Sequence, residues 1–104
     1  MSTPEQLVHS IKQATDYQTN KKLLREQILT DLHVPCNGGL FKISPDLIAF
    51  LNSWDTDNLV LEDVYQNPIK VDRQELLTLC KEHYQLIMNR WHIEHEELRR
   101  IRKI

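Results

Sequence analysis

Apolar residues recur at steps of three or four along the first third of the chain, and only Lys21 interrupts them. This spacing predicts the apolar face of an α-helix, made of Leu7, Ile11, Ala14, Tyr17, Leu24, Ile28 and Leu32. Thr3-Pro4-Glu5-Gln6 is typical of a helix start, with Thr as the N-cap and Pro at the first helical position. Pro35 predicts that the helix ends before it. We expect one helix over 4–31, or two helices if Asn20 caps a second one.

The segment 33–71 alternates short apolar runs with turn-forming residues. Asn37-Gly38 predicts the two-residue turn of a β-hairpin, because both turn residues need a positive φ angle. Ser44-Pro45 predicts the cap of a short helix. Gln66-Asn67-Pro68, between two apolar runs, predicts a second hairpin. We therefore expect a small α/β head of two β-hairpins and a short helix.

A second long helix is predicted over 73–103, because Asp72-Arg73-Gln74-Glu75 has the pattern of a capping box and no Gly or Pro follows it. Such a helix would be about 46 Å long, whereas a compact domain of 104 residues has a diameter of roughly 35 Å. The last helix should therefore return antiparallel to the first, with the head at one end. The sequence predicts a mostly helical α+β protein with a single domain, 1–104.

Apolar residues also keep a heptad spacing along this last helix, as in a coiled-coil seam. Leu77, Tyr84, Trp91 and Leu98 take one seam position, and Cys80, Ile87, Glu94 and Ile101 take the other. The apolar face narrows towards the C-terminus, which suits one partner helix. We expect Trp91, Leu98 and Ile101 to be buried against another helix, of the same chain or of a second one.

Composition excludes several function classes. Thirteen basic residues face 15 acidic ones, so the chain lacks the basic surplus of a dedicated nucleic-acid binder. Its two glycines are adjacent, which excludes the separated-glycine motifs of nucleotide-binding loops and serine hydrolases. No apolar run reaches the roughly 20 residues of a membrane span, and the N-terminus lacks the pattern of a signal peptide. Two distant cysteines predict free thiols in a reducing compartment. We expect a cytoplasmic protein with no membrane partner.

Histidines and cysteines of the last helix raise the question of a metal site. His92, His95 and Glu96 share one helical face, but further ligands are missing from the pattern, which favours a solvated face. Cys80 lies one turn before His83 and could bind zinc together with Cys36. Cys80 also belongs to the seam, which favours a buried, inert thiol. As a nucleophile, Cys36 would need a paired base that the sequence does not indicate, so a strand residue is favoured.

The acidic segment 55–63 begins like a calcium-binding loop, with Asp55-Thr56-Asp57-Asn58. It lacks the glycine at the sixth position, and Gln66 stands where the twelfth position requires glutamate. These acidic residues are therefore expected to form a solvated loop and hairpin face. The sequence predicts no metal, no cofactor and no catalytic residue, and so a protein that is not an enzyme.

Basic residues gather at the end of the last helix, where Arg99, Arg100, Arg102 and Lys103 follow three glutamates. Cations in the last turn of a helix are favoured by its dipole, and this interpretation is preferred. The alternative is a contact to phosphate or to an acidic partner.

Three stretches resemble small uncharacterised proteins of T4-like phages of cyanobacteria. They are Gly39-Leu40-Phe41-Lys42-Ile43-Ser44-Pro45, Phe50-Leu51-Asn52-Ser53-Trp54 and Glu62-Asp63-Val64-Tyr65-Gln66-Asn67-Pro68-Ile69. The resemblance implies a phage-encoded protein in the host cytoplasm or the virion. It contains no motif of established function, so it assigns no site residue. The order helix–hairpins–helix is also similar to that of prefoldin subunits, a likeness of topology that implies no function.

These patterns predict a non-enzymatic adaptor or assembly factor that self-associates, or binds a protein partner, through its C-terminal helix. The predicted partner-binding residues are Leu77, Tyr84, Ile87, Trp91, Leu98 and Ile101. We expect a homo-oligomer. The alternative is an accessory nucleic-acid-binding protein that uses Arg99, Arg100, Arg102 and Lys103. Salt separates the two hypotheses, because phosphate contacts weaken steeply with salt and apolar contacts do not.

Overall fold

The computed structural model describes residues 3–102, except for the side chains at positions 10, 11, 13, 14 and 102. As the sequence predicts, the fold is α+β and mostly helical, with a long C-terminal helix and two small antiparallel sheets. In chain order its elements are α1 (Pro4–Asp31), β1 (His33–Cys36), β2 (Gly39–Lys42), α2 (Pro45–Ser53), β3 (Asn58–Glu62), β4 (Pro68–Asp72) and α3 (Arg73–Arg102). Lys103, in which the second long helix was expected to end, lies outside the described residues.

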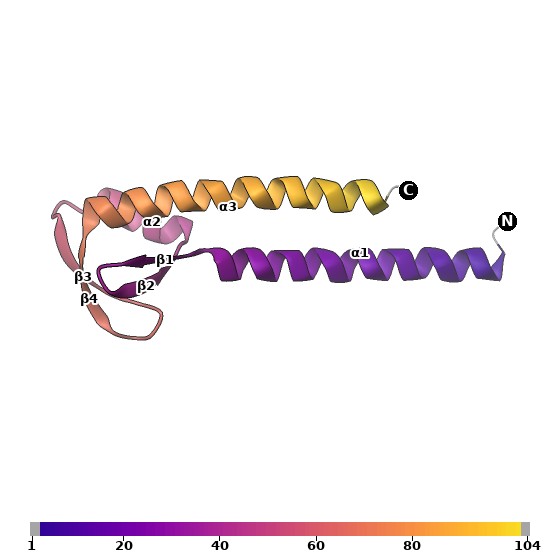
Figure 1. Cartoon of the computed structure of the whole chain (residues 1–104), viewed down its shortest axis with the longest axis horizontal. Coiled ribbons are helices and arrows are strands. Elements are labelled where there is room, and N and C mark those ends of the chain that lie inside the picture. The colour runs from indigo at the N-terminus through magenta and orange to yellow at the C-terminus, as the bar shows by residue number, and fades with distance from the viewer. Residues whose placement is uncertain (1–2, 103–104) are drawn as a thin grey trace.

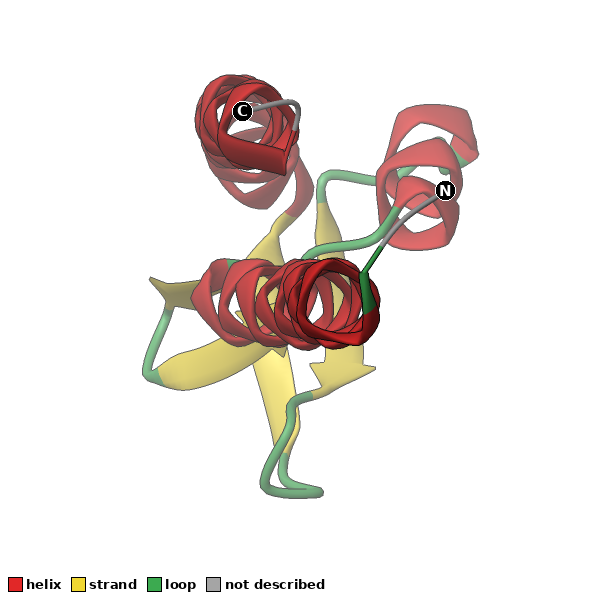
Figure 2. Ribbon diagram, turned by 90° about the vertical axis from the view of Figure 1, so that its right-hand side faces the viewer, coloured by secondary structure: helices red, strands yellow, loops and turns green. Residues whose placement is uncertain are grey.

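The molecule is elongated, with extents of 67 × 23 × 18 Å. α1 and α3 are antiparallel, and both extend from the strands towards the same end of the molecule (Figure 1). They lie side by side when the molecule is viewed from its end (Figure 2). We call these two helices the stalk, and the four strands with α2 the head. The stalk exceeds the dimensions of the head because each of its helices is longer than a compact domain of this size.

α1 continues through Asn20, where the sequence allowed a break. Its first turn is closed by the expected capping box: the N–H of Gln6 donates to Thr3 Oγ1 at 3.2 Å, and the N–H of Thr3 donates to Gln6 Oε1 at 3.0 Å. The N-terminal part of α1 reaches beyond the end of α3 (Figure 1). Leu7, the first residue of the predicted apolar face, is therefore exposed.

The first hairpin has the predicted two-residue turn. Cys36 pairs with Gly39 across it, and the φ angles of Asn37 and Gly38 are 52° and 87°. The side chain of Asn37 also stabilises the head, because its Oδ1 accepts from the backbone N–H of Asp72 at 3.3 Å. The turn therefore connects the first hairpin to the end of the second.

Gly38→Val is expected to lower the free energy of unfolding by about 1–3 kcal/mol. A Cβ at this position would meet no heavy atom within 4 Å, so the cost comes from the backbone conformation alone. Urea denaturation of the parent and the variant measures it. Gly38→Asn is the matched control, because Asn tolerates a left-handed conformation. Equal losses in both variants would contradict this explanation.

The second hairpin turns earlier than the sequence predicts, because β3 ends at Glu62 and Asp63 begins the turn. Asp63 was expected to be solvated with the other acidic residues of 55–63, but its side chain is only 6% exposed, which corrects that interpretation. Its Oδ1 accepts from the N–H groups of Tyr65 and Asn67, both at 3.0 Å. Its Oδ2 accepts from the N–H of Leu40 at 3.2 Å. One carboxylate thus orders the turn and attaches it to β2.

The hydrophobic core lies where the head meets α3 and the C-terminal end of α1. Asp72 caps α3 by accepting from the N–H of Glu75 at 3.1 Å, as its sequence pattern predicts. The guanidinium of Arg73 donates to the carbonyl of Leu51 at 2.9 Å and pairs with Asp57 at 3.1 Å, which attaches α2 to the start of α3. The buried apolar residues are Ile28, Leu32, Val34, Cys36, Phe41, Ile43, Leu51, Val71, Leu76, Leu77, Cys80 and Ile87.

Candidate partner-binding surface of the stalk

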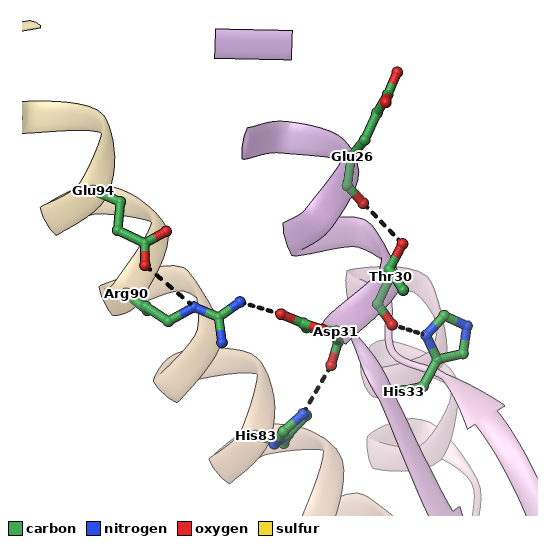
Figure 3. Close-up of polar contacts among 7 residues, drawn as sticks. All are labelled: Glu26, Thr30, Asp31, His33, His83, Arg90 and Glu94. Atoms are coloured by element: carbon green, nitrogen blue, oxygen red, sulfur yellow. Dashed lines mark hydrogen bonds and ion pairs between the residues drawn. The ribbon is translucent and has the colours of Figure 1, made fainter. Parts of the chain in front are cut away.

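Polar contacts hold the two stalk helices together close to the head (Figure 3). Asp31, at the end of α1, accepts twice from α3. Its carboxylate forms an ion pair with Arg90, and its carbonyl accepts from Nε2 of His83 at 2.9 Å. Arg90 Nε also lies 3.9 Å from a carboxylate oxygen of Glu94 on its own helix. These contacts fix the register of α3 against α1, and with it the position of every side chain further along the stalk.

The predicted partner-binding residues fall into three environments. Leu77 and Ile87 are buried in the core of the single chain, so a partner cannot reach them. This corrects their assignment. Tyr84 and Trp91 are half-buried and pack against the same core. Leu98 is half-buried, and Ile101 is 66% exposed. Ile101 is therefore not buried by its own chain, and its expected burial requires a helix of a second chain.

Leu98 and Ile101 line a groove of about 360 Å³ on one side of the contact between α1 and α3. We call it the acidic groove, because Glu94 and Glu97 line it and no described lining residue carries a positive charge. Only Leu24 from α1 adds apolar surface opposite the α3 residues. α1 thus covers Ile101 incompletely. The full lining is Asn20, Leu24, Gln27, Glu94, Glu97, Leu98 and Ile101.

A second groove, of about 460 Å³, is also formed by α1 and α3. We call it the basic groove, because its charged residues are Lys21, Lys22 and Arg25, and none of its described lining residues is acidic. These three cations form no ion pair within residues 3–102. Met88 and Trp91 give the groove an apolar surface. The full lining is Gln18, Lys21, Lys22, Arg25, Met88, Trp91, His92 and His95.

Sequence reasoning missed the basic groove because it was assembled from two helices far apart in the chain. Each helix contributes positions i, i+3, i+4 and i+7, namely 18 to 25 and 88 to 95. The available signal was Lys21, which interrupts the apolar stripe of α1. His92 and His95, interpreted as a solvated face, lie at this groove. Among the described residues, no three His, Cys, Asp or Glu side chains are placed to hold one metal ion.

Both cysteines lie in the core as free thiols. Burial raises the pKa of Cys80 to about 11, and the nearby Cys36 adds to this shift. Burial also raises the pKa of Cys36, with smaller contributions from Glu75 and Asp72. The thiol of Cys36 donates to Oδ1 of Asn37 at 3.0 Å. Buried thiols with raised pKa values are poor nucleophiles, so the environment favours a packing role for both.

At the basic C-terminal tip, the side chains of two cations are described, Arg99 and Arg100, and the first of them forms an ion pair. Arg99 forms an ion pair with Glu96 at 3.1 Å, the i,i+3 arrangement expected of charges that stabilise a helix end. Arg100 is exposed. The side chain of Arg102 and all of Lys103 lie outside the described part of the chain.

The comparisons with known proteins place the chain in no family: no protein-family model, no curated protein and no solved structure matches it. Within residues 3–102, no helix combines the length and the apolar character needed to cross a membrane.

Proposed function

We propose that this protein is a non-enzymatic adaptor or assembly factor that self-associates through its stalk, with α3 supplying most of the contact. The observation that carries this proposal is the exposure of large apolar side chains along α3: Leu86 is 64% exposed, Ile93 is 58% exposed and Ile101 is 66% exposed. An apolar line of this kind on an extended helix is typical of an interaction site.

Helical spacing places these side chains on the side of the acidic groove. Ile93 precedes Glu97 by four residues, and residues four apart are neighbours on a helix surface. On α1, Leu23 follows Asn20 by three residues and is exposed. Leu98 and Ile101 line the groove itself, so both helices contribute apolar side chains on this side of the stalk. Burying each large aliphatic side chain contributes roughly 1.5–3 kcal/mol, so several from each copy can outweigh the roughly 4–15 kcal/mol that association costs.

Replacing Ile93 and Ile101 together with Gln is expected to lower the molar mass in solution, measured by light scattering, while the Tm of the monomer changes little. Both side chains are already exposed in the single chain, so their removal leaves no cavity. Trp91 and Leu98 are less suitable for this test, because Trp91 packs against the core and its loss would also destabilise the fold.

The matched control is Glu82→Gln, an exposed position nearer the head on the same helix. It should leave the mass unchanged. A parent protein that is monomeric at all accessible concentrations would refute the proposal. The measurement is repeated at about 0.05 and 0.5 M salt, because an assembly held by apolar contacts persists at the higher concentration. A mass that comes from bound nucleic acid falls steeply with salt, and this result would favour the alternative that the basic tip binds nucleic acid.

A further inference from the structure

The two grooves of the stalk differ in charge although the same two helices form both. The basic groove contains three cations and two histidines and no described carboxylate. The acidic groove contains Glu94 and Glu97 and no described cation. Two packed helices have one groove on each side of their line of contact, so the stalk presents a basic side and an acidic side along the same stretch of its length.

The grooves also match in their apolar character. Met88 and Trp91 lie in the basic groove, and Leu24, Leu98 and Ile101 lie in the acidic one. Each groove is thus an apolar strip bordered by charges of a single sign. A surface of this composition fits a partner that carries an apolar strip bordered by the opposite charges. The acidic side of the stalk has that composition.

We propose that the basic groove of one copy receives the acidic side of the stalk of a second copy. This inference rests on the self-association proposed above and specifies its geometry. Lys21, Lys22 and Arg25 of one copy face Glu94 and Glu97 of the next, while Trp91 and Met88 contact Leu98 and Ile101. Pairing two like sides would instead bring cations against cations or carboxylates against carboxylates, which disfavours a symmetric interface.

The geometry has a consequence for assembly. An interface between two different surfaces is heterologous. In a pair, one copy therefore keeps an unused acidic groove and the other copy keeps an unused basic groove. Such contacts continue into a ring or an open chain of copies. We therefore expect the assembly to contain more than two copies and its mass to rise with protein concentration unless a ring closes.

Reversing the charges of one groove at a time tests this geometry. The first variant combines Lys21→Glu, Lys22→Glu and Arg25→Glu. The second combines Gln27→Lys and Glu97→Lys, which spares Glu94 and its contact with Arg90. Each variant alone should have the mass of a monomer, because its two grooves now carry the same sign. An equimolar mixture should regain a larger mass, because the first variant keeps a native acidic groove and the second keeps a native basic one.

Two controls separate charge complementarity from damage to the fold. Lys70→Glu, on an exposed position of β4, should leave the mass of the parent unchanged. In about 1 M salt, where the Debye length is about 3 Å, each reversed variant should regain part of its association, because screening removes the repulsion. Circular dichroism melting confirms that both variants are folded.

Each other outcome overturns the inference in a recognisable way. If both reversed variants keep the mass of the parent, self-association stands but does not use the grooves. If the mixture stays monomeric while the variants are folded, the two grooves do not bind each other and the inference is wrong. If the parent itself is monomeric at every concentration, the proposed function fails together with this inference.

Discussion

Asp63→Ala is expected to lower the Tm by on the order of 10 °C or more. The carboxylate accepts from the backbone N–H groups of Leu40, Tyr65 and Asn67, and alanine would leave these three donors without that acceptor. The turn of the second hairpin would keep only the backbone bond from the N–H of Val64 to the carbonyl of Leu40 at 2.9 Å as its hydrogen bond to β2, so the effect should spread through the head. Thermal melting followed by circular dichroism measures it, with Asp55→Ala, an exposed carboxylate in the loop before β3, as the matched control. Equal Tm values for parent and Asp63→Ala would show that the turn holds without the carboxylate.

The same side chain predicts a dependence of stability on pH. The N–H of Asn67 lowers the pKa of the Asp63 carboxyl, with further contributions from Leu40 and Tyr65, and burial partly opposes them. Because the pKa is lower in the folded chain than in the unfolded one, the stabilisation is complete above the unfolded pKa of about 3.9 and is lost as the pH falls through the folded pKa. Between about pH 5 and pH 3, the Tm of the parent should therefore fall more than that of Asp63→Asn.

Leu76→Ala is expected to lower the free energy of unfolding by about 2–5 kcal/mol. Leu76 is fully buried at the start of α3, within the core that joins this helix to the head. Truncation there removes apolar contacts and leaves a cavity that a packed interior fills only in part. Urea denaturation at a single protein concentration measures the loss. A change below about 0.5 kcal/mol would mean that the site is no more constrained than a surface position.

The control for this prediction uses the same substitution on the same helix. Leu86→Ala, at a position that is 64% exposed, should change the free energy of unfolding by less than about 0.5 kcal/mol. The contrast between Leu76 and Leu86 also separates the two roles of α3. Its first half stabilises the fold of the single chain, and its exposed apolar side chains are available for assembly.

This division of α3 gives an elongated molecule of 104 residues a buried core at one end and exposed apolar side chains along its stalk. Its compact core is confined to the head and the adjoining ends of the stalk helices. Beyond the contacts of Asp31 with His83 and Arg90, the stalk consists of two helices whose flanking grooves remain open. Grooves of this kind are shaped to receive a side chain strip of another molecule.

Elements that depend on neighbouring residues can be read from the amino-acid sequence alone. Thr3, Ser44 and Asp72 cap helices within three residues of themselves, and Asn37-Gly38 forms its turn with the positive φ angles that only a few residue types accept readily. The long helices follow from the absence of Gly and Pro and from the heptad and three-to-four spacing. Such features need no information about distant parts of the chain, so a local pattern predicts them.

What each face of these helices contacts depends instead on how the elements pack in three dimensions. The heptad seam of α3 has one pattern along its length, yet Leu77 and Ile87 are buried in the core while Ile101 is exposed, because the core covers only the first half of the helix. The burial of Asp63, the ion pair of Asp31 with Arg90 and the basic groove all join residues more than 20 positions apart. Contacts of this kind depend on how the elements pack, and the local spacing of residues carries no record of that packing.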